Sequence, residues 1–221
     1  MRRQFLKDLI KETWRGKSLP RILINNRMRK TPEIKGKILD LASGKNRPSY
    51  YRFLNVDKNA EIISVDVSDE RKPDIKADLE KSFPFKGGDF DYVFCFNLLE
   101  HIFNYKNVIN ESFRVLKKEG KIIGTVPFLG SVHADPDDYF RYTKSTLEKL
   151  FNQAGFKEIN IEALGYGPFA IGYYMIASAF PKIIRLFLLF SAIFLDKIIV
   201  KFKRQHNKDK YVLMYYFECK K

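Results

Sequence analysis

Two short stretches of the chain bring together side chains that can transfer protons. One is LLEHI, residues 98–102, in which His101 follows an apolar run. The other is SVHADPDDYFRYT, residues 131–143, which is dense in histidine, acid, tyrosine and arginine. A histidine can accept a proton from a hydroxyl or an amine, while tyrosine and arginine add stacking and anion binding. The candidate catalytic residues are His101, His133, Asp138, Tyr139 and Arg141.

Both stretches also have a purely structural interpretation. His101 can brace the helix that follows it, instead of accepting a proton. Residues 131–143 can be a solvated loop whose Thr143, together with Ser145, starts a helix. We favour the functional interpretation for the second stretch, because loops at this end of a sheet carry specificity.

Three acidic residues lie in or just after apolar, strand-like runs. Asp40 lies in ILDL before the small loop Ala42-Ser43-Gly44, Asp66 ends EIISVD, and Asp78 lies in KADLE. The loop matches neither GxxxxGK[ST] nor GxGxxG, which excludes the two common phosphate-binding loops. Asp66 is placed to accept hydrogen bonds from ribose hydroxyls, and Asp78 from an exocyclic amine. This arrangement suits a cationic ligand that is part nucleoside and part amino acid, such as S-adenosylmethionine.

Alternating strands and helices predict the fold that positions these residues. We expect strands over 38–42, 61–66, 74–77, 90–97, 121–126, 156–161 and 211–219, and helical segments over 3–14, 20–30, 48–54 and 105–118. A further helix is expected from the capping box at Ser145-Thr146-Leu147-Glu148 to a stop at Gly155. This alternation favours a doubly wound α/β sheet, whose ligands bind beyond the carboxyl ends of the strands.

The order of these motifs resembles that of class I S-adenosylmethionine-dependent methyltransferases, in the type 11 methyltransferase family. ILDLASGKN resembles the family's first motif, SVDVS its acidic second motif, and KADLEKSFPFKGGDFDYVFCFNLLEHI its third and fourth motifs. RVLKKEGKIIGTVP resembles the helix and strand that follow. The resemblance covers about residues 34–160 and the last strand. It implies a Rossmann-like, mostly parallel seven-stranded sheet with an antiparallel last strand.

The resemblance also implies S-adenosylmethionine as the cofactor and assigns residues to its parts. The methionine part would contact Asp40, Ala42, Ser43 and Gly44. Asp66 and Val67 would hold the ribose and flank the adenine, which Asp78 and Leu79 would meet. Asn97 would line the floor near the sulfonium. Ala42 departs from the family, which usually has glycine at this position. No metal site is expected from the sequence.

Charge divides the chain into a near-neutral body and two basic ends. Residues 1–35 carry 11 Lys/Arg and 3 Asp/Glu, residues 181–221 carry 10 and 3, and residues 36–180 carry 19 and 20. We expect basic N-terminal helices over 1–35, a methyltransferase domain over 36–162 and 209–221, and an apolar helical insertion over 163–208. Basic ends attract an anionic membrane face or nucleic acid, although they also serve solubility alone.

The apolar residues 163–200 form two runs that polar or helix-breaking residues interrupt. Gly165, Gly167 and Pro168 break the first run early, and the second contains Arg185 and Asp196. We therefore favour two helices that lie in a membrane interface over a membrane span. The same helices can instead pack on the domain or form a homodimer interface.

The location and the acceptor are open to several interpretations. The N-terminus lacks a signal-peptide pattern and the two cysteines, Cys95 and Cys219, lie far apart, so we expect a cytoplasmic protein, peripheral at the inner membrane face. The favoured function is methyl transfer to a small-molecule, glycan or lipid-linked acceptor. An RNA or DNA methyltransferase is less favoured. Enzymes that methylate base amines have an Asn-Pro-Pro-Tyr-like motif after strand four, whereas this chain has Asn97-Leu98-Leu99-Glu100 there. A non-catalytic, membrane-associated protein that keeps the fold is the third alternative.

Overall fold

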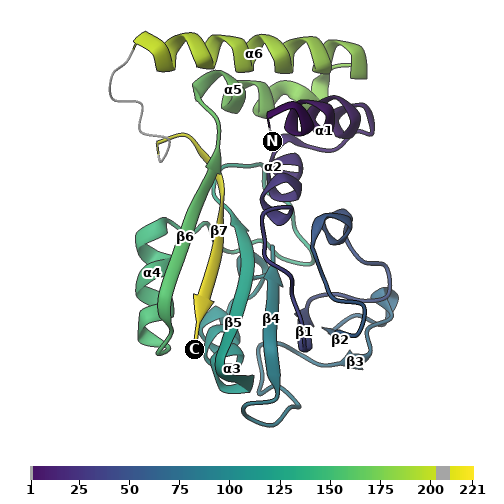
Figure 1. Ribbon diagram of the computed structural model, residues 1–221, viewed down its shortest axis with the longest axis vertical. Helices are drawn as coiled ribbons and strands as arrows, with labels where there is room; N and C mark the ends of the chain where they lie inside the picture. The colour runs from purple at the N-terminus through teal and green to yellow at the C-terminus, as the bar shows by residue number, and fades with distance from the viewer. Residues whose placement is uncertain (1, 203–209) are drawn as a thin grey trace.

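A seven-stranded mixed sheet forms the centre of the molecule (Figure 1). The computed structural model describes residues 2–202 and 210–221, and its strands lie in the order β3-β2-β1-β4-β5-β7-β6. The strands are β1 (Lys37–Leu41), β2 (Glu61–Asp66), β3 (Ile75–Lys76), β4 (Phe90–Phe96), β5 (Leu116–Pro127), β6 (Lys157–Gly165) and β7 (Val212–Lys220). All pairs are parallel except those of β7, which runs antiparallel to β5 and β6. The expected sheet is therefore confirmed.

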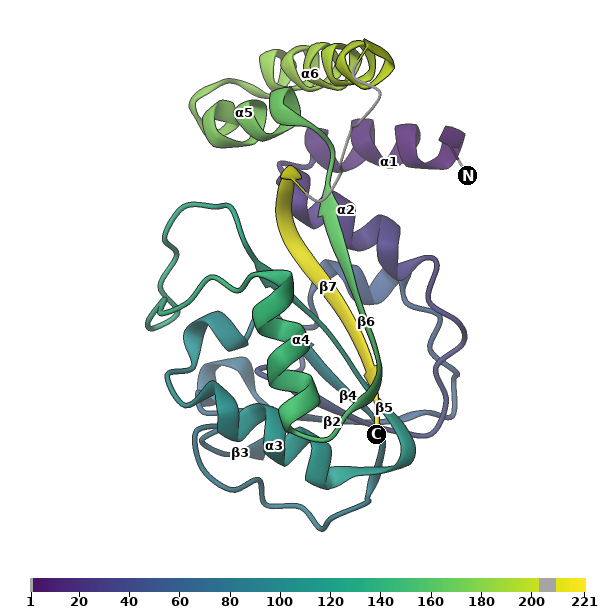
Figure 2. The ribbon, with the colours of Figure 1, turned by 90° about the vertical axis from the view of Figure 1, so that its left-hand side faces the viewer.

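Helices α3 (Tyr105–Val115) and α4 (Lys144–Gln153) cover one face of the sheet (Figure 2). Val108 and Ile109 of α3 and Leu147 and Phe151 of α4 are buried there, as the helical spacing of these apolar residues predicts. The packed side chains include Val93 of β4. This layer supports the sheet from the side opposite the N-terminal helices.

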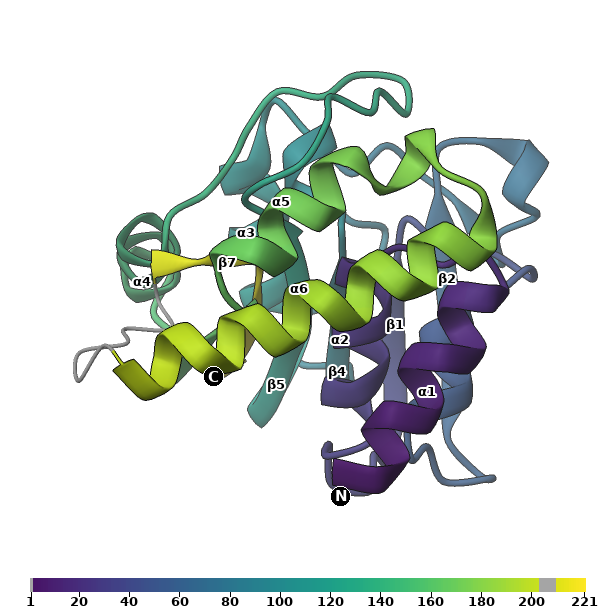
Figure 3. The same cartoon turned by 90° about the horizontal axis from the view of Figure 1, so that it is seen from above.

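Helices from before β1 and from between β6 and β7, together with the segment after β1, pack against the second face and the upper end of the sheet (Figures 1 and 3). The elements are α1 (Arg2–Trp14), α2 (Leu19–Met28), the 3-10 helix η1 (Ser49–Phe53), α5 (Pro168–Ile176) and α6 (Lys182–Phe202). Their buried side chains, such as Met28 and Leu189, form one core with Phe94 and Tyr216 of the sheet. Figure 3 shows α1, α5 and α6 lying together over one end of the molecule, and we call them the outer helical layer.

The polar residues within the apolar segment tie its two helices together. Asp196 of α6 is 1% exposed and accepts hydrogen bonds from the backbone amides of Phe169 (2.9 Å) and Ala170 (3.0 Å), in the first turn of α5. It thus caps α5 from another helix. Arg185 donates in turn to the carbonyl oxygens of Phe180 and Ser178, in the turn between the helices. Asp196 and Arg185, which interrupt the hydropathy pattern, therefore hold the α5–α6 hairpin closed.

Several boundaries differ from the predicted ones for identifiable reasons. The helix expected over 48–54 is reduced to the 3-10 helix η1, and α3 ends at Val115 because Leu116 enters β5 directly. The capping box predicted at Ser145 is wrong: Thr143 is the N-cap, and its hydroxyl accepts a hydrogen bond from the Thr146 amide. Gly155 does follow α4 with a φ of 95°, as a helix stop requires.

The apolar segment begins later than predicted. Strand β6 continues to Gly165 because it pairs along β7, where Gly165 lies opposite Val212. The expected insertion over 163–208 therefore includes three residues of the sheet at its start, and residues 203–209, which contain its expected end, lie outside the described residues. Within residues 2–202 and 210–221, no helix combines the length and the apolar character needed to cross a bilayer.

Candidate functional site

A cavity of about 700 Å³ lies beyond the carboxyl ends of β1, β2 and β4. We call it the main cavity. It occupies the position where the strand order reverses, which is the usual ligand site of doubly wound sheets. The predicted residues that line it are Ala42, Asp66, Val67, Asp78, Leu79 and Asn97 for the cofactor, and His101, His133 and Tyr139 for catalysis. The structure thus brings together two sets of residues that were predicted from separate motifs.

Three residues predicted to contact the methionine part, Asp40, Ser43 and Gly44, do not line the main cavity. Asp40 is 1% exposed and accepts a hydrogen bond from the hydroxyl of Tyr51 in η1. Burial raises the pKa of Asp40 to about 6, against hydrogen bonding that lowers it. A Cβ at Gly44 would overlap the backbone carbonyl of Arg71, so this glycine is needed for contact within the chain. Asp40 and Gly44 thus make contacts within the chain.

Two residues of the cavity wall have a left-handed backbone. Ala42 has a φ of 53° and Asn97 a φ of 49°, each directly after a parallel strand. Asparagine adopts this conformation readily, whereas alanine rarely does. Asn97 is also held to β5, because its side-chain oxygen accepts a hydrogen bond of 2.8 Å from the hydroxyl of Thr125. The glycine usual at position 42 thus corresponds to a conformation that Ala42 still adopts.

Arg71, which sequence reasoning missed, connects both sides of the main cavity. It lies in η2 (Asp69–Arg71), and its Nε is 3.4 Å from a carboxylate oxygen of Asp66. Its guanidinium also contacts the carbonyl oxygen of Ala42 and the carboxylate of Asp135. Because Asp135 is 64 positions away in the chain, no local pattern could have indicated this contact.

A second missed residue, Arg21, reaches the main cavity from α2. Its guanidinium carbon lies 5.5 Å from the centre of the Tyr50 ring, which also lines the cavity. Burial lowers the pKa of Arg21, and within the described residues its Nη1 atom has no hydrogen-bond partner. A guanidinium in this position suits a carboxylate or phosphate group of a ligand.

The acidic loop between β5 and α4 is ordered by an internal ion pair. Asp138 is 2% exposed in its side chain and pairs with Arg141, which holds the pKa of Asp138 well below its usual range. Asp138 also accepts a hydrogen bond of 2.9 Å from the backbone amide of His133. Neither Asp138 nor Arg141 lines the main cavity, so their position fits support of His133 rather than contact with a substrate.

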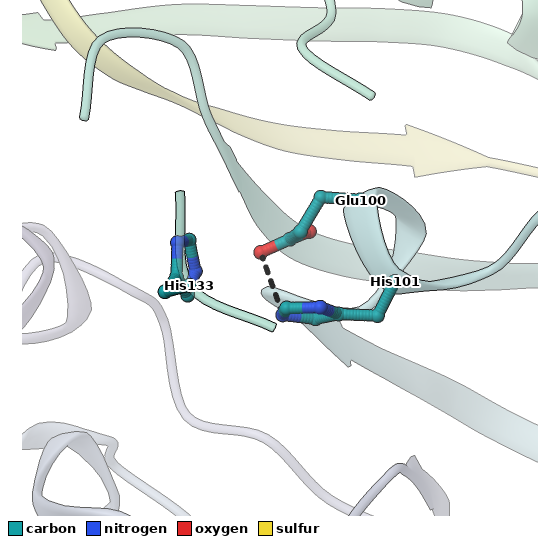
Figure 4. Close-up of side chains that lie close together, drawn as sticks. All are labelled: Glu100, His101 and His133. Atoms are coloured by element: carbon teal, nitrogen blue, oxygen red, sulfur yellow. Dashed lines mark ion pairs between the residues drawn. The ribbon is translucent and has the colours of Figure 1, made fainter. Parts of the chain in front are cut away.

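The two candidate histidines meet beside a buried acid that sequence reasoning did not select (Figure 4). Glu100 and His101 lie in or at the end of η3 (Leu99–His101), and the acidic loop brings His133 to them. The rings of His101 and His133 have centroids 5.2 Å apart, and His101 Nε2 lies 3.8 Å from a Glu100 carboxylate oxygen. Glu100 is fully buried, which raises its pKa to about 8.

Comparisons with known proteins agree with this geometry. Residues 36–124 match the model of a family described as a methyltransferase domain. The chain is 32% identical over 124 residues to an uncharacterized protein of Methanocaldococcus jannaschii, covering 52% of this chain and 55% of that protein. It is 24% identical over 216 residues to the demethylmenaquinone methyltransferase of Lactococcus lactis, covering 77% of this chain and 82% of that enzyme.

Solved structures with the same fold include several methyltransferases. One from Archaeoglobus fulgidus, described as S-adenosylmethionine-dependent, gives a TM-score of 0.59 at 18% identity and covers 96% of this chain and 98% of its own. Phosphoethanolamine N-methyltransferase 2 of Haemonchus contortus, solved with S-adenosylmethionine, gives a TM-score of 0.56 at 15% identity. The match covers 91% of this chain and 52% of that enzyme. The chain thus spans about half the length of some of the relatives it matches. The match of residues 36–124 to the methyltransferase-domain model and the strand order of the sheet show that the chain shares the fold of these methyltransferases.

Proposed function

We propose that the chain is an S-adenosylmethionine-dependent methyltransferase that acts on an amphiphilic acceptor at a membrane surface. The observation that carries the acceptor proposal is a row of adjoining cavities. A second cavity of about 210 Å³ shares Arg21, Asn97 and His133 with the main cavity. A third, of about 270 Å³, shares Ser18 and other residues with the second and reaches the outer helical layer. A polar head at the main cavity can thus continue into an apolar tail along these helices.

The main cavity supports the cofactor part of the proposal. Asp66 at the end of β2 is the acceptor for the ribose hydroxyls, and Asp78 and Leu79 after β3 are placed for the adenine. The carboxylate of the methionine part finds a cationic partner in Arg21. Since the sulfonium is already activated, the residues around Asn97 have mainly to align the acceptor with the methyl group and exclude water.

The acceptor side supplies candidate bases. His101 and His133 line the main cavity, where the head group of the acceptor would lie, and His133 also lines the second cavity. Either imidazole can take the proton that a hydroxyl or amine loses when it is methylated. Tyr139, at the edge of the same cavity, is held by a hydrogen bond of 2.9 Å from its hydroxyl to Asp137.

The outer helical layer supports a membrane surface as the source of the acceptor. Large apolar side chains are exposed on all three of its helices: Leu6, Ile10 and Trp14 of α1, Phe169, Met175 and Ile176 of α5, and Ile183, Phe187, Phe194 and Ile198 of α6. Lys7, Lys11, Lys182 and Lys197 are exposed on the same helices. Apolar side chains flanked by lysines favour binding to an anionic bilayer interface.

Calorimetric titration with S-adenosylmethionine and S-adenosylhomocysteine tests the cofactor part. We expect micromolar binding by the wild-type chain and a loss of at least about tenfold in Asp66→Ala, since each lost charged hydrogen bond is worth about 1.5–3 kcal/mol. Asp69→Ala is the matched control, because Asp69 is exposed and does not line the main cavity. If folded protein binds neither ligand, the enzyme proposal fails and the non-catalytic alternative takes its place.

Vesicle flotation tests the membrane part separately. The wild-type chain should float with anionic vesicles more than with neutral ones, and Phe187→Glu with Phe194→Glu should abolish flotation. Phe103→Glu is the control, because Phe103 is about as exposed as Phe187 but lies after η3, outside the outer helical layer. Equal flotation of all proteins, or none, would refute the membrane surface. Incubation of membrane extracts with radiolabelled cofactor then shows whether the label enters the lipid or the aqueous fraction.

A further inference from the structure

Glu100, His101 and His133 form a cluster of potential metal ligands on the acceptor side of the main cavity (Figure 4). One ligand atom from each residue lies within 4.8 Å of the other two. Two histidines and one carboxylate are the ligand set of many catalytic zinc and non-haem iron sites, which keep open positions for substrate. Within the described residues, this is the group of three such side chains that lies close enough to share an ion.

Both imidazoles are oriented from outside the cluster. The Nδ1 atom of His101 lies 2.5 Å from the backbone carbonyl oxygen of Asp137, and that of His133 lies 3.1 Å from the carbonyl oxygen of Ser131. A carbonyl oxygen can only accept, so each Nδ1 carries the proton and each Nε2 keeps its lone pair. Metal-binding histidines commonly have this arrangement, in which an outer hydrogen bond fixes the tautomer and the ring.

The third ligand is independently unusual, because it is buried without a partner. Glu100 is 0% exposed, and within the described part of the chain no other residue donates a hydrogen bond to either carboxylate oxygen. Its backbone is fixed, since its carbonyl oxygen accepts a hydrogen bond of 2.7 Å from the Tyr139 amide. A buried carboxylate without a partner is costly, and a bound cation would compensate it.

We infer that Glu100, His101 and His133 bind a divalent transition-metal ion of the zinc type. His101 and His133 line the main cavity, so an ion held by the three residues would be within reach of a ligand bound there. Ligand atoms lie about 2.0–2.2 Å from zinc, so two atoms that bind the same ion must be less than twice that distance apart. His101 Nε2 and the Glu100 carboxylate oxygen, at 3.8 Å, already meet this condition.

The site also suggests the class of acceptor atom, a step that rests on the proposed function. With both imidazoles bound to the ion, neither would act as the base. A hydroxyl oxygen bound to the ion would instead lose its proton more easily to water, and the oxygen would then take the methyl group from the sulfonium. The products are the methyl ether, S-adenosylhomocysteine and the released proton. An oxygen acceptor, such as a phenol or another hydroxyl, is therefore favoured over an amine.

Zinc titration of the untagged, chelator-treated chain tests the site without any methyl transfer. We expect one equivalent to bind with micromolar affinity or better, and cobalt to give visible absorption bands that zinc abolishes. His133→Ala should weaken binding by at least about tenfold, because even outer-shell changes cost 10–100-fold. The His133 side chain is half-exposed, so this variant should fold. Glu100→Gln should show the same loss.

Glu70→Gln provides the matched control for these variants. Glu70 also lines the main cavity but is not a member of the cluster, so its replacement should leave zinc affinity unchanged. The absence of micromolar binding, or equal binding by the wild type and both ligand variants, would overturn the site. Calorimetry with S-adenosylhomocysteine on the same zinc-free sample separates this outcome from failure of the proposed function, which predicts cofactor binding without the metal.

Discussion

Replacement of Asp40 by asparagine should make the protein more stable at neutral pH. Burial raises the pKa of Asp40 from 3.8 to about 6, so the folded state prefers the uncharged carboxyl group. Each pKa unit corresponds to about 1.4 kcal/mol, and the charged form therefore costs about 3 kcal/mol of folding free energy. Asparagine keeps the size of the side chain and an oxygen that can accept from Tyr51, but it has no charge to bury.

The pH dependence gives this prediction its sign. The contribution of Asp40 is fully present below its unfolded pKa, near 3.8, and is lost as the pH rises through about 6. In urea unfolding, Asp40→Asn should thus gain about 2–3 kcal/mol over the wild type at pH 7.5 and little or nothing at pH 4. A difference between the two proteins that stays constant across this range would refute the assignment.

Asp74→Asn is the control of opposite sign. Hydrogen bonds from the hydroxyl and backbone amide of Ser64 lower the pKa of Asp74, so the folded state prefers its charged form. Its contribution is present above the unfolded pKa and is lost as the pH falls through the lowered folded value. Asp74→Asn should therefore destabilise the protein at neutral pH, and the difference should shrink in acid.

Three further substitutions test other features of the structure. Ala42→Gly should change the free energy of unfolding by less than about 1 kcal/mol, because relief of the left-handed backbone strain offsets the added entropy of the unfolded chain. Calorimetry should show equal or tighter binding of S-adenosylhomocysteine by this variant, and weaker binding would contradict the role given to position 42. Gly44→Ala should lower the melting temperature strongly, since its Cβ would overlap the Arg71 carbonyl, and an unchanged melt would show that the loop adapts. Asp196→Ala should cost about 1–3 kcal/mol and increase amide exchange in α5, whose first amides lose their acceptor; unchanged exchange there would argue against the cap.

The sheet was predictable because its information is local. EIISVD was predicted as a strand with the bounds that β2 has, since apolar residues with high strand propensity end there in an acid. The alternation of strands and helices then indicated a doubly wound sheet, and Asp66, Asp78 and Asn97 came with the strand ends. The order of motifs along the chain was therefore sufficient to predict most of the residues that line this side of the main cavity.

The remaining site residues depend on contacts that only the folded chain creates. Glu100 precedes His101 in a sequence that looks like a helix start, and nothing local indicates that it is fully buried. Arg21 reaches the cavity from a helix that was expected as part of the basic N-terminal helices and not as part of the site. Asp40 was expected to face the cofactor, but it accepts a hydrogen bond from Tyr51 of the 3-10 helix η1, a contact between residues 11 positions apart.

The place where the α5–α6 hairpin joins the sheet makes this part of the chain separable from the rest. Strands β6 and β7 are antiparallel neighbours, and Gly165 and Val212, where the chain leaves and re-enters the sheet, lie opposite each other. A turn of a few residues would close the same strand pair, and a longer connection is also tolerated, because the free-energy cost of closing a loop rises only slowly with its length. The residues between can thus be exchanged for a shorter or different cover without a change in sheet register. On the proposed function, replacing this one part would change the acceptor range, while the strand ends that line the main cavity stay as they are.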